Sequence, residues 1–368
     1  MKRSLRFVGL DVHKDSVVIA VADSGTAPAE VVTVVPNERM AILKVLDRLG
    51  PRRRLRVCYE AGPTGYGLAR FLRGQGIACS VVAPSLVPIR RGCRVKTDRR
   101  DAVKLAQFLR SGELVEVAIP TPETEALRDL ERSREDAVCA ERAARQQLDK
   151  FLLRHERNWT AGRKWTGRHW SWVRAQEFPD PVLRRVHEDY QKAACAAALR
   201  IEELTHQIEE LVEKTPLAPL VTALQALRGV GLVTAVTVAA EIGEFCRFAR
   251  PRQLMAFVGL VPGEHSSGAR RRQGAITRTG NKHVRWILTE AAWNYRFLPR
   301  ASKALARRRA AVSPEVRAIA ERAEERLCRR FQKLLRQGKA KNKAVTAIAR
   351  ELVGFIWTIA GVEKKLAA

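Results

Sequence analysis

The first third of the chain alternates apolar, β-branched runs with amphipathic stretches. Short apolar runs bounded by polar or turn residues predict strands, and apolar positions spaced three or four apart predict helices. The first helix should end at Gly50 and Pro51. The expected elements are, in order, strands at 5–10, 16–22 and 31–35, a helix at 40–49, a strand at 55–59, a helix at 66–74 and a strand at 79–83. This part of the chain is therefore predicted to be a mixed α/β domain.

Three strands that can pair as a meander, followed by β–α–β–α, is the order of an RNase H-like (RuvC-like) fold. We expect that domain to cover residues 1–125. A helical segment should follow over 126–215, then a second, mainly α-helical domain over 216–310, and a basic helical C-terminal segment over 311–368.

The middle segment is helical and strongly charged. Its apolar residues Ile201, Leu204, Ile208 and Leu211 repeat at 3-4-3 spacing, which is typical of a coiled-coil seam. An ordinary helical hairpin explains so short a run equally well. Trp159, Trp165, Trp170 and Trp172 alternate with basic residues between the two arms. These rings could stack on nucleic-acid bases or simply close the tip of the hairpin.

The second domain begins after Pro216 and Pro219 with a helix, the turn Gly229-Val230-Gly231 and a long apolar helix over 232–242. This turn resembles a helix–hairpin–helix, in which a helix N-terminus and free N–H groups face a DNA phosphate. A glycine turn between two packed helices is an equally good interpretation. A short helical element and a turn are expected over 245–263 and an apolar helix over 283–297, with a basic, glycine-containing segment at 266–282 between them.

The charge balance points to a polyanionic partner. The 368 residues include 67 Lys and Arg against 39 Asp and Glu, a net charge of +28. Nucleic acid is the expected partner rather than an acidic membrane, which would favour one compact basic amphipathic helix. The seven cysteines have neither zinc-binding spacing nor an even count, so we expect thiols in a reducing cytoplasm. The longest apolar stretches, 232–240 and 352–362, are too short to span a bilayer, so no membrane partner is expected.

Four carboxylates are candidates for a metal site. Asp11 ends the first strand and Glu60 ends the fourth, and an RNase H-like sheet makes those strands neighbours. An ionised carboxylate in a central strand is costly unless it is paired or bound to a metal. Asp98 and Asp101 open a helix at i and i+3, on one face. Four oxygen donors without His or Cys predict Mg²⁺ or Mn²⁺. Each carboxylate taken alone could instead be a cap or an ion-pair partner.

Three runs carry a family resemblance: Gly9-Leu10-Asp11-Val12-His13-Lys14, Tyr59-Glu60-Ala61-Gly62-Pro63-Thr64-Gly65 and Lys96-Thr97-Asp98-Arg99-Arg100-Asp101-Ala102. They resemble the DEDD transposases of the insertion-sequence one-ten family. The resemblance covers roughly residues 5–125 and 220–295. It implies a transposase that cleaves DNA and exchanges strands in a prokaryotic cytoplasm, associated with the nucleoid when it acts, and it implies that residues 216–310 form the transposase domain.

The resemblance also implies a nucleophilic serine. In the family a serine directly before a glycine attacks the DNA, which corresponds to Ser267 in Ser266-Ser267-Gly268, with Ser266 as the alternative. His265 is the one nearby candidate base. Positive charge around this loop would stabilise the phosphorane. The expected nucleic-acid-binding residues are Arg270, Arg271, Arg272, Arg278, Lys282 and the turn residues Gly229 and Gly231.

The partners implied by the resemblance are donor and target DNA, a guide (bridge) RNA and further copies of the chain in a homodimer or tetramer. Two alternatives remain open. A hydrolytic nuclease of the Holliday-junction type would use the same carboxylates with water as the nucleophile. A non-catalytic nucleic-acid-binding module would use only the basic residues.

Overall fold

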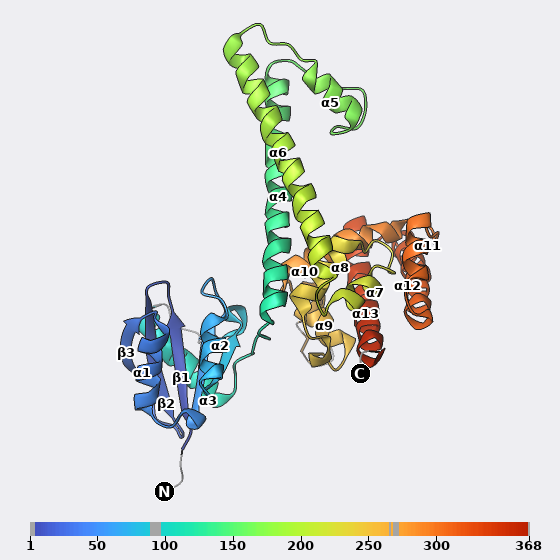
Figure 1. Cartoon of the computed structure of the whole chain (residues 1–368). Coiled ribbons are helices and arrows are strands. Elements are labelled where there is room, and N and C mark those ends of the chain that lie inside the picture. The colour runs from blue at the N-terminus through green and yellow to red at the C-terminus, as the bar shows by residue number, and fades with distance from the viewer. Residues whose placement is uncertain (1–3, 89–96, 265, 268–271, 367–368) are drawn as a thin grey trace. The chain divides into compact units, whose positions relative to one another are not determined.

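The computed structural model describes residues 4–88, 97–264, 266–267 and 272–366, and it divides the chain into two compact units, residues 1–119 and 120–368. The first unit holds one five-stranded sheet of order β3-β2-β1-β4-β5 (Figure 1). The first three strands pair antiparallel, and β4 and β5 continue parallel to β1. The strands are β1 (Arg6–Val12), β2 (Ser16–Asp23), β3 (Glu30–Pro36), β4 (Leu55–Glu60) and β5 (Ala78–Val82). The predicted mixed α/β sheet is confirmed.

Helices cover both faces of this sheet. On one face α1 (Arg39–Leu49) and α2 (Gly67–Gly74) bury Ile42 and Leu72 against alternate residues of the strands. On the other face α3 (Asp98–Ser111) packs through Ala102, Leu105 and Ala106. The short 3-10 turns η1 (Arg52–Arg54) and η2 (Pro84–Leu86) precede β4 and follow β5. Because successive side chains of a strand point to opposite faces of the sheet, every second residue of the central strands points at α3.

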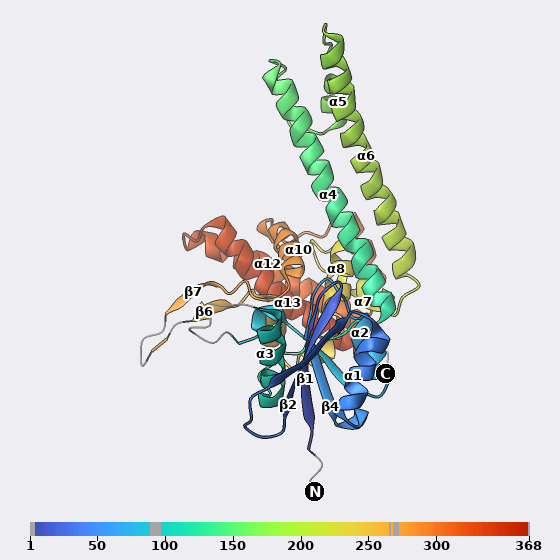
Figure 2. The same ribbon diagram turned by 90° about the vertical axis from the view of Figure 1, so that its left-hand side faces the viewer.

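The second unit begins with two long helices, α4 (Pro122–Arg154) and α6 (Pro181–Val212), which lie side by side (Figures 1 and 2). They run antiparallel, since Arg134 Nε donates to Thr205 Oγ1 at 2.6 Å whereas Phe151 meets His187 farther along the pair. Of the expected seam, Ile208 is buried but Leu211 is 46% exposed. Coiled-coil packing along the whole pair therefore stays a prediction.

The far end of the α4–α6 pair carries a small aromatic core. Phe151, Val173 and Phe178 are buried there, and α5 (Gly167–Arg174) supplies Val173. The tryptophans of this segment are half-buried, and three of them pack directly against the core: Trp165, Trp170 and Trp172. This packing agrees with the interpretation that the rings close the tip of the hairpin.

The rest of the second unit is a helical body around one apolar core. Its helices are α7 (Ala218–Leu224), α8 (Leu232–Ile242), η3 (Phe245–Arg247), α9 (Pro251–Phe257), α10 (Lys282–Ala292), η4 (Trp293–Arg296), α11 (Lys303–Ala310), α12 (Pro314–Arg336) and α13 (Lys341–Leu366). Two short strands, β6 (Pro262–Glu264) and β7 (Gln273–Ile276), pair antiparallel between α9 and α10. The sequence pattern did not predict this hairpin, because its strands are short, exposed and without apolar alternation.

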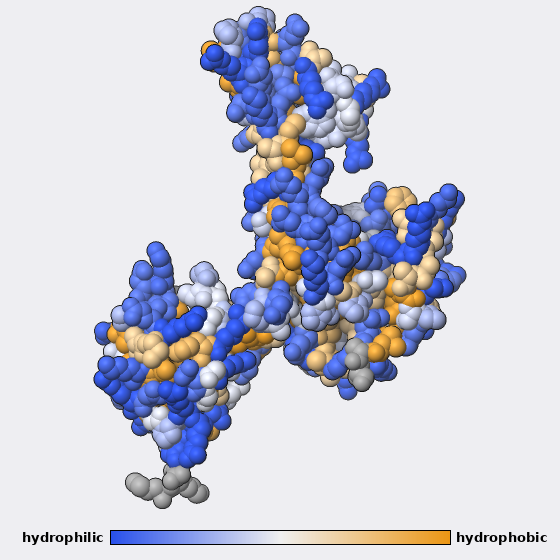
Figure 3. Space-filling view, in the orientation of Figure 1, coloured by the Kyte–Doolittle hydropathy of each residue, from blue (hydrophilic) through white to orange (hydrophobic). Residues whose placement is uncertain are grey.

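The apolar stretch 352–362 is only part of the longer helix α13. This helix has 26 residues and is, by length and composition alone, long and apolar enough to cross a membrane, but half of its most apolar part is buried inside the protein. Ile348, Leu352 and Ile356 lie in the core of the helical body. The helix extends beyond the stretch 352–362 at both ends, and the apolar face of α13 packs against the other helices of the body. The face of the molecule shown in Figure 3 is mainly hydrophilic, with apolar side chains showing along the α4–α6 pair and in smaller patches on both units.

Two buried ion-pair groups tie the helices of this unit together. Glu324 on α12 contacts Arg228 and Arg309, each at 2.7 Å, and all three side chains are largely buried. His283 on α10 contacts Glu131 and lies 2.6 Å from Glu135, both on α4. Burial acts to lower the pKa of His283, but the hydrogen bond to Glu131 and the charges of Glu131, Glu135 and Glu241 raise it above its ordinary value. With a carboxylate of α4 at each ring nitrogen, His283 links α4 to α10.

Candidate active site

Gly9 sets the distance between β1 and α3. A Cβ at this position would lie 2.3 Å from the carbonyl oxygen of Ala102 and 2.5 Å from the amide nitrogen of Ala106. Both are backbone atoms of α3, so only a residue without a side chain allows this approach. Strand alternation puts Asp11 on the same face as Gly9, beside the start of the helix.

The first turn of α3 carries the acidic pair. The Thr97 hydroxyl caps the helix by accepting from the backbone N–H of Arg100, so that α3 begins at Asp98. Asp98 and Asp101 are three residues apart, and Ala102 follows on the same face. Because Ala102 packs on the sheet next to Gly9, the acidic turn lies over the end of β1.

Asp11, His13 and Asp98 come together at this point. One ligand atom from each side chain lies within 4.8 Å of the others. His13 Nε2 is 3.1 Å from Asp11 Oδ2 and 3.6 Å from Asp98 Oδ2. An imidazole therefore lies beside two of the four expected carboxylates. His13 was named in the family motif but not as a site residue, because it lies past the predicted strand, where local pattern says nothing about the direction of a side chain.

The electrostatics of this cluster favour a cation. Burial raises the pKa of the Asp11 carboxyl above its ordinary value; the hydrogen bond and charge of His13 oppose that rise, and the charges of Asp98 and Asp101 add to it. Like charges held this close disfavour the ionised form, and a bound cation relieves the repulsion. Two carboxylates and an imidazole are a donor set that fits a divalent ion such as Mn²⁺ or, with further oxygen ligands, Mg²⁺.

The other two expected carboxylates lie outside the gathered group. Among the described residues, Glu60 and Asp101 are not part of the cluster of three. Glu60 is exposed at the end of β4, one position beyond the paired residues Leu10 and Tyr59, and so it is next to Asp11 in register. Lys104 Nζ lies 3.0 Å from Asp101 Oδ1. Both carboxylates therefore lie on the same side of the sheet as the cluster.

The serine doublet follows β6. Ser266 Oγ donates to Glu264 Oε1 at 2.9 Å, and both Ser266 and Ser267 are exposed. Glu264 was not a predicted site residue, because a carboxylate two positions before a serine is common in polar loops. His265, Gly268, Arg270 and Arg271 lie outside the described residues.

The base of the β6–β7 hairpin is held rigidly by backbone contacts. A Cβ at Gly259 would lie 2.2 Å from the Thr279 carbonyl oxygen, and one at Gly280 would lie 2.0 Å from that of Phe257. Both glycines have positive φ, of 72° and 92°. Thr277 N–H also donates to the Val261 carbonyl at 2.9 Å. The strands flanking the serine loop are thereby fixed to the end of α9 and the start of α10.

The remaining predicted binding residues are divided between surface and interior. Arg272, Arg278 and Lys282 are exposed. A Cβ at Gly229 would lie 2.4 Å from the Ala291 carbonyl oxygen, whereas Gly231 has open space around it and precedes α8. The close contact at Gly229 agrees with a glycine turn between packed helices.

Comparison with known proteins identifies the family. A family model described as a transposase, of the DEDD type of IS110, matches residues 8–156, and the model of the "Transposase IS116/IS110/IS902 family" matches residues 221–307. The chain is 44% identical to a putative transposase (y4qE) of Sinorhizobium fredii, over 96% of this chain and 88% of the relative. It is 33% identical to the transposase for insertion sequence element IS1533 of Leptospira borgpetersenii, over 91% and 97% of the two chains. The chain therefore belongs to the IS110 family of DEDD transposases.

Proposed function

We propose that this transposase cleaves and rejoins DNA at the ends of an insertion sequence through a metal-dependent site on the α/β sheet and a serine on the β6–β7 hairpin. The observation that carries the proposal is the convergence of Asp11, His13 and Asp98 where β1 meets α3. The two carboxylates of this cluster repel each other, and a bound divalent cation would relieve that repulsion. The family assignment makes DNA the substrate.

The metal ligands in this proposal are Asp11, Glu60, Asp98 and Asp101, with His13 as an added ligand or as the group that orients Asp11. A divalent ion held there would act as a Lewis acid on a phosphate and lower the pKa of a hydroxyl bound to it. The protein's own part is to hold the carboxylates in place. Gly9 does so by letting α3 approach β1, and the Thr97 cap does so by starting the helix at Asp98.

Ser267 is the proposed nucleophile. Its oxygen would attack a phosphodiester, form a phosphoserine ester with one DNA end and release the other end as a hydroxyl. That hydroxyl, or one from the second DNA, would later attack the ester and restore Ser267. The rigid base of the hairpin favours such a step, because a nucleophile held in place avoids the entropic cost of alignment. Glu264 accepts a hydrogen bond from the Ser266 hydroxyl, whereas no side-chain hydrogen bond to another described residue holds the Ser267 hydroxyl.

The remaining parts of the proposal rest on family membership and charge. A net charge of +28 suits a chain that binds more than one nucleic acid. We therefore propose a guide (bridge) RNA as a partner beside donor and target DNA, and an assembly of two or four copies. The proposed functional divisions of the chain are residues 1–125, 126–215, 216–310 and 311–368. The proposed place of action is the nucleoid.

Trapping the covalent intermediate tests the serine. The full chain is incubated with its co-purifying RNA, a divalent ion and DNA spanning the ends of its own element, and protein-linked DNA is then counted after denaturation. We expect the adduct with the unchanged chain and with Ser266→Ala, and we expect its loss with Ser267→Ala and Asp11→Asn.

Each other outcome identifies a different mechanism. A variant that combines Ser266→Ala with Ser267→Ala tests the alternative. If it still cleaved DNA without forming an adduct, water would be the nucleophile, as in a hydrolytic nuclease. If Ser266→Ala lost the adduct and Ser267→Ala kept it, Ser266 would be the nucleophile and Glu264 its base. Full activity of Asp11→Asn would overturn the metal site, and Lys14→Gln is the matched surface control beside it.

A further inference from the structure

A basic groove separates the β6–β7 hairpin from the start of α13. On the hairpin side the groove is lined by Leu260, Pro262 and β7. On the other side it is lined by the residues around the start of α13, from Lys339 to Arg350. The hairpin and α13 are about 70 residues apart in sequence, and they become neighbours because α9 and α10 both pack on α13.

The charge of this groove is positive and uncompensated. Its cations are Arg278, Lys339, Lys343 and Arg350, and no carboxylate appears among the described residues that line it. Within that described part of the chain, none of these four side chains forms an ion pair. Arg278, Lys339 and Lys343 are exposed and Arg350 is half-buried, so the charged ends can reach a ligand.

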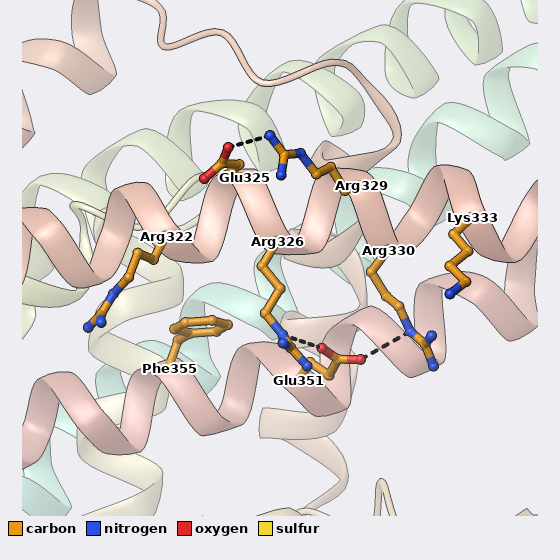
Figure 4. Close-up of a pocket in the computed structure, with 8 residues that line it drawn as sticks. All are labelled: Arg322, Glu325, Arg326, Arg329, Arg330, Lys333, Glu351 and Phe355. Carbon is orange, nitrogen blue, oxygen red and sulfur yellow. Dashed lines mark hydrogen bonds and ion pairs between the residues drawn. The ribbon is translucent and has the colours of Figure 1, made fainter.

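A second basic groove, between α12 and α13, provides the contrast (Figure 4). There Glu351 lies 3.0 Å from Arg326 and 3.3 Å from Arg330, and Glu325 lies 2.5 Å from Arg329 (Figure 4). The two carboxylates pair with three of the four arginines that line this groove, and Glu351 ties α12 to α13. The cations of the hairpin groove have no such structural task.

We propose that the groove between the β6–β7 hairpin and α13 binds the sugar–phosphate backbone of the DNA strand that the hairpin serine attacks. This inference rests on the proposed function of that serine. It adds Lys339, Lys343 and Arg350, from the basic C-terminal segment, to the DNA-binding surface of the transposase.

The dimensions of the groove suit a nucleic-acid strand. Lys343 and Arg350 are seven residues apart on α13, or about 10 Å along the helix axis. A DNA strand carries one phosphate per roughly 3.4 Å of axis, so about three phosphates lie along that length. The lining also offers polar hydrogen-bonding side chains between the cations, namely Gln273, Asn342 and Thr346. Charged and amide side chains in alternation are typical of backbone contacts that position DNA without reading its sequence.

The groove lies next to the hairpin that carries the serine loop. β7 forms one wall, and β7 pairs with β6, whose last residue, Glu264, holds Ser266. A strand held in the groove would therefore lie beside the hairpin that carries the serine loop. Because phosphate contacts carry no sequence information, the groove would hold any strand that the remainder of the complex has selected.

Salt dependence of DNA binding tests the groove. The test uses full-length protein with its co-purifying RNA and with Ser267→Ala, so that no chemistry intervenes, and a labelled duplex of the element junction. The groove variant combines Lys339→Gln, Lys343→Gln and Arg350→Gln. We plot the logarithm of the DNA association constant against the logarithm of the salt concentration. We expect the slope of this plot to be shallower by about 2.7 in the groove variant, since three cations are removed. The increase in affinity on going from about 200 to about 50 mM salt would then be roughly 40-fold smaller than for the parent protein.

A variant of equal charge provides the control. Arg322→Gln, Arg329→Gln and Lys333→Gln remove three cations from the α12–α13 groove, on the same unit. We expect the groove variant to lose clearly more slope than this control, with both proteins keeping the parent melting temperature. An unchanged slope in the groove variant, an equal loss in the control, or a loss confined to a labelled RNA of the same length would overturn the proposal. Because binding is measured without the nucleophile, a failed serine mechanism would leave this result intact.

Discussion

Replacing Gly9 by alanine should separate the two halves of the metal site without touching a ligand. The new Cβ would lie 2.3 Å from the Ala102 carbonyl oxygen, whereas ordinary Cβ contacts begin at 3.4 Å. The neighbouring atoms belong to the backbone of α3, so no side chain can rotate out of the way. The helix must therefore move away from β1 by about 1 Å, and it would carry Asp98 with it.

The cost of this shift can be estimated from the contact. Inserting one methyl group into a close-packed interface typically costs about 1–3 kcal/mol. For a unit of this size that is roughly 5–15 °C of melting temperature, so Gly9→Ala should remain folded at 25 °C. A displacement of about 1 Å in catalytic groups typically costs about 10²-fold in rate. We expect a loss of that order in the rate of DNA cleavage.

The assay compares Gly9→Ala with Gly74→Ala in the same unit. A Cβ at Gly74, the last residue of α2, meets nothing within 4 Å. Gly74→Ala should therefore leave cleavage unchanged and leave the melting temperature equal or slightly raised. Cleavage per folded molecule is measured under single-turnover conditions, with folding checked by circular dichroism. If Gly9→Ala matched Gly74→Ala in both cleavage and melting temperature, the account of α3 held against β1 through Gly9 would be wrong.

Two further predictions concern the helical body. Because the pKa of His283 is raised in the fold above its ordinary 6.5, the stability from its glutamate contacts is fully present below pH 6.5 and is lost as pH rises through the folded value. Thermal melts at pH values above 6.5 should therefore fall more steeply for the unchanged chain than for His283→Gln, and parallel curves would contradict the assignment. Glu324→Gln removes the partner of two largely buried arginines and should cost about 3–5 kcal/mol in urea unfolding. Glu325→Gln, which breaks one exposed pair, should cost less than about 1 kcal/mol, and equal losses would refute the importance of the buried group.

Much of the architecture follows from the sequence alone. The apolar runs of the first third predicted all five strands of the sheet and the helices between them, because burial of alternate or periodic positions is a local property that a strand or helix displays directly. Asp11 and Glu60 stood out for the same reason, as charges at the ends of apolar runs. The acidic pair at Asp98 and Asp101 was recognisable from helical spacing and from the family motif.

The tertiary structure decided which of these residues meet. Nothing local to His13 says that its ring turns toward Asp98, 85 positions away, and nothing local to Gly9 says that the backbone of α3 lies against it. The serine-bearing hairpin was not predicted because its strands have no apolar face, and the full length of α13 was not predicted because charged and polar residues precede its most apolar stretch. Such features depend on close approaches between distant segments. Periodicity records that a residue is buried, but only the packed chain determines what it is buried against.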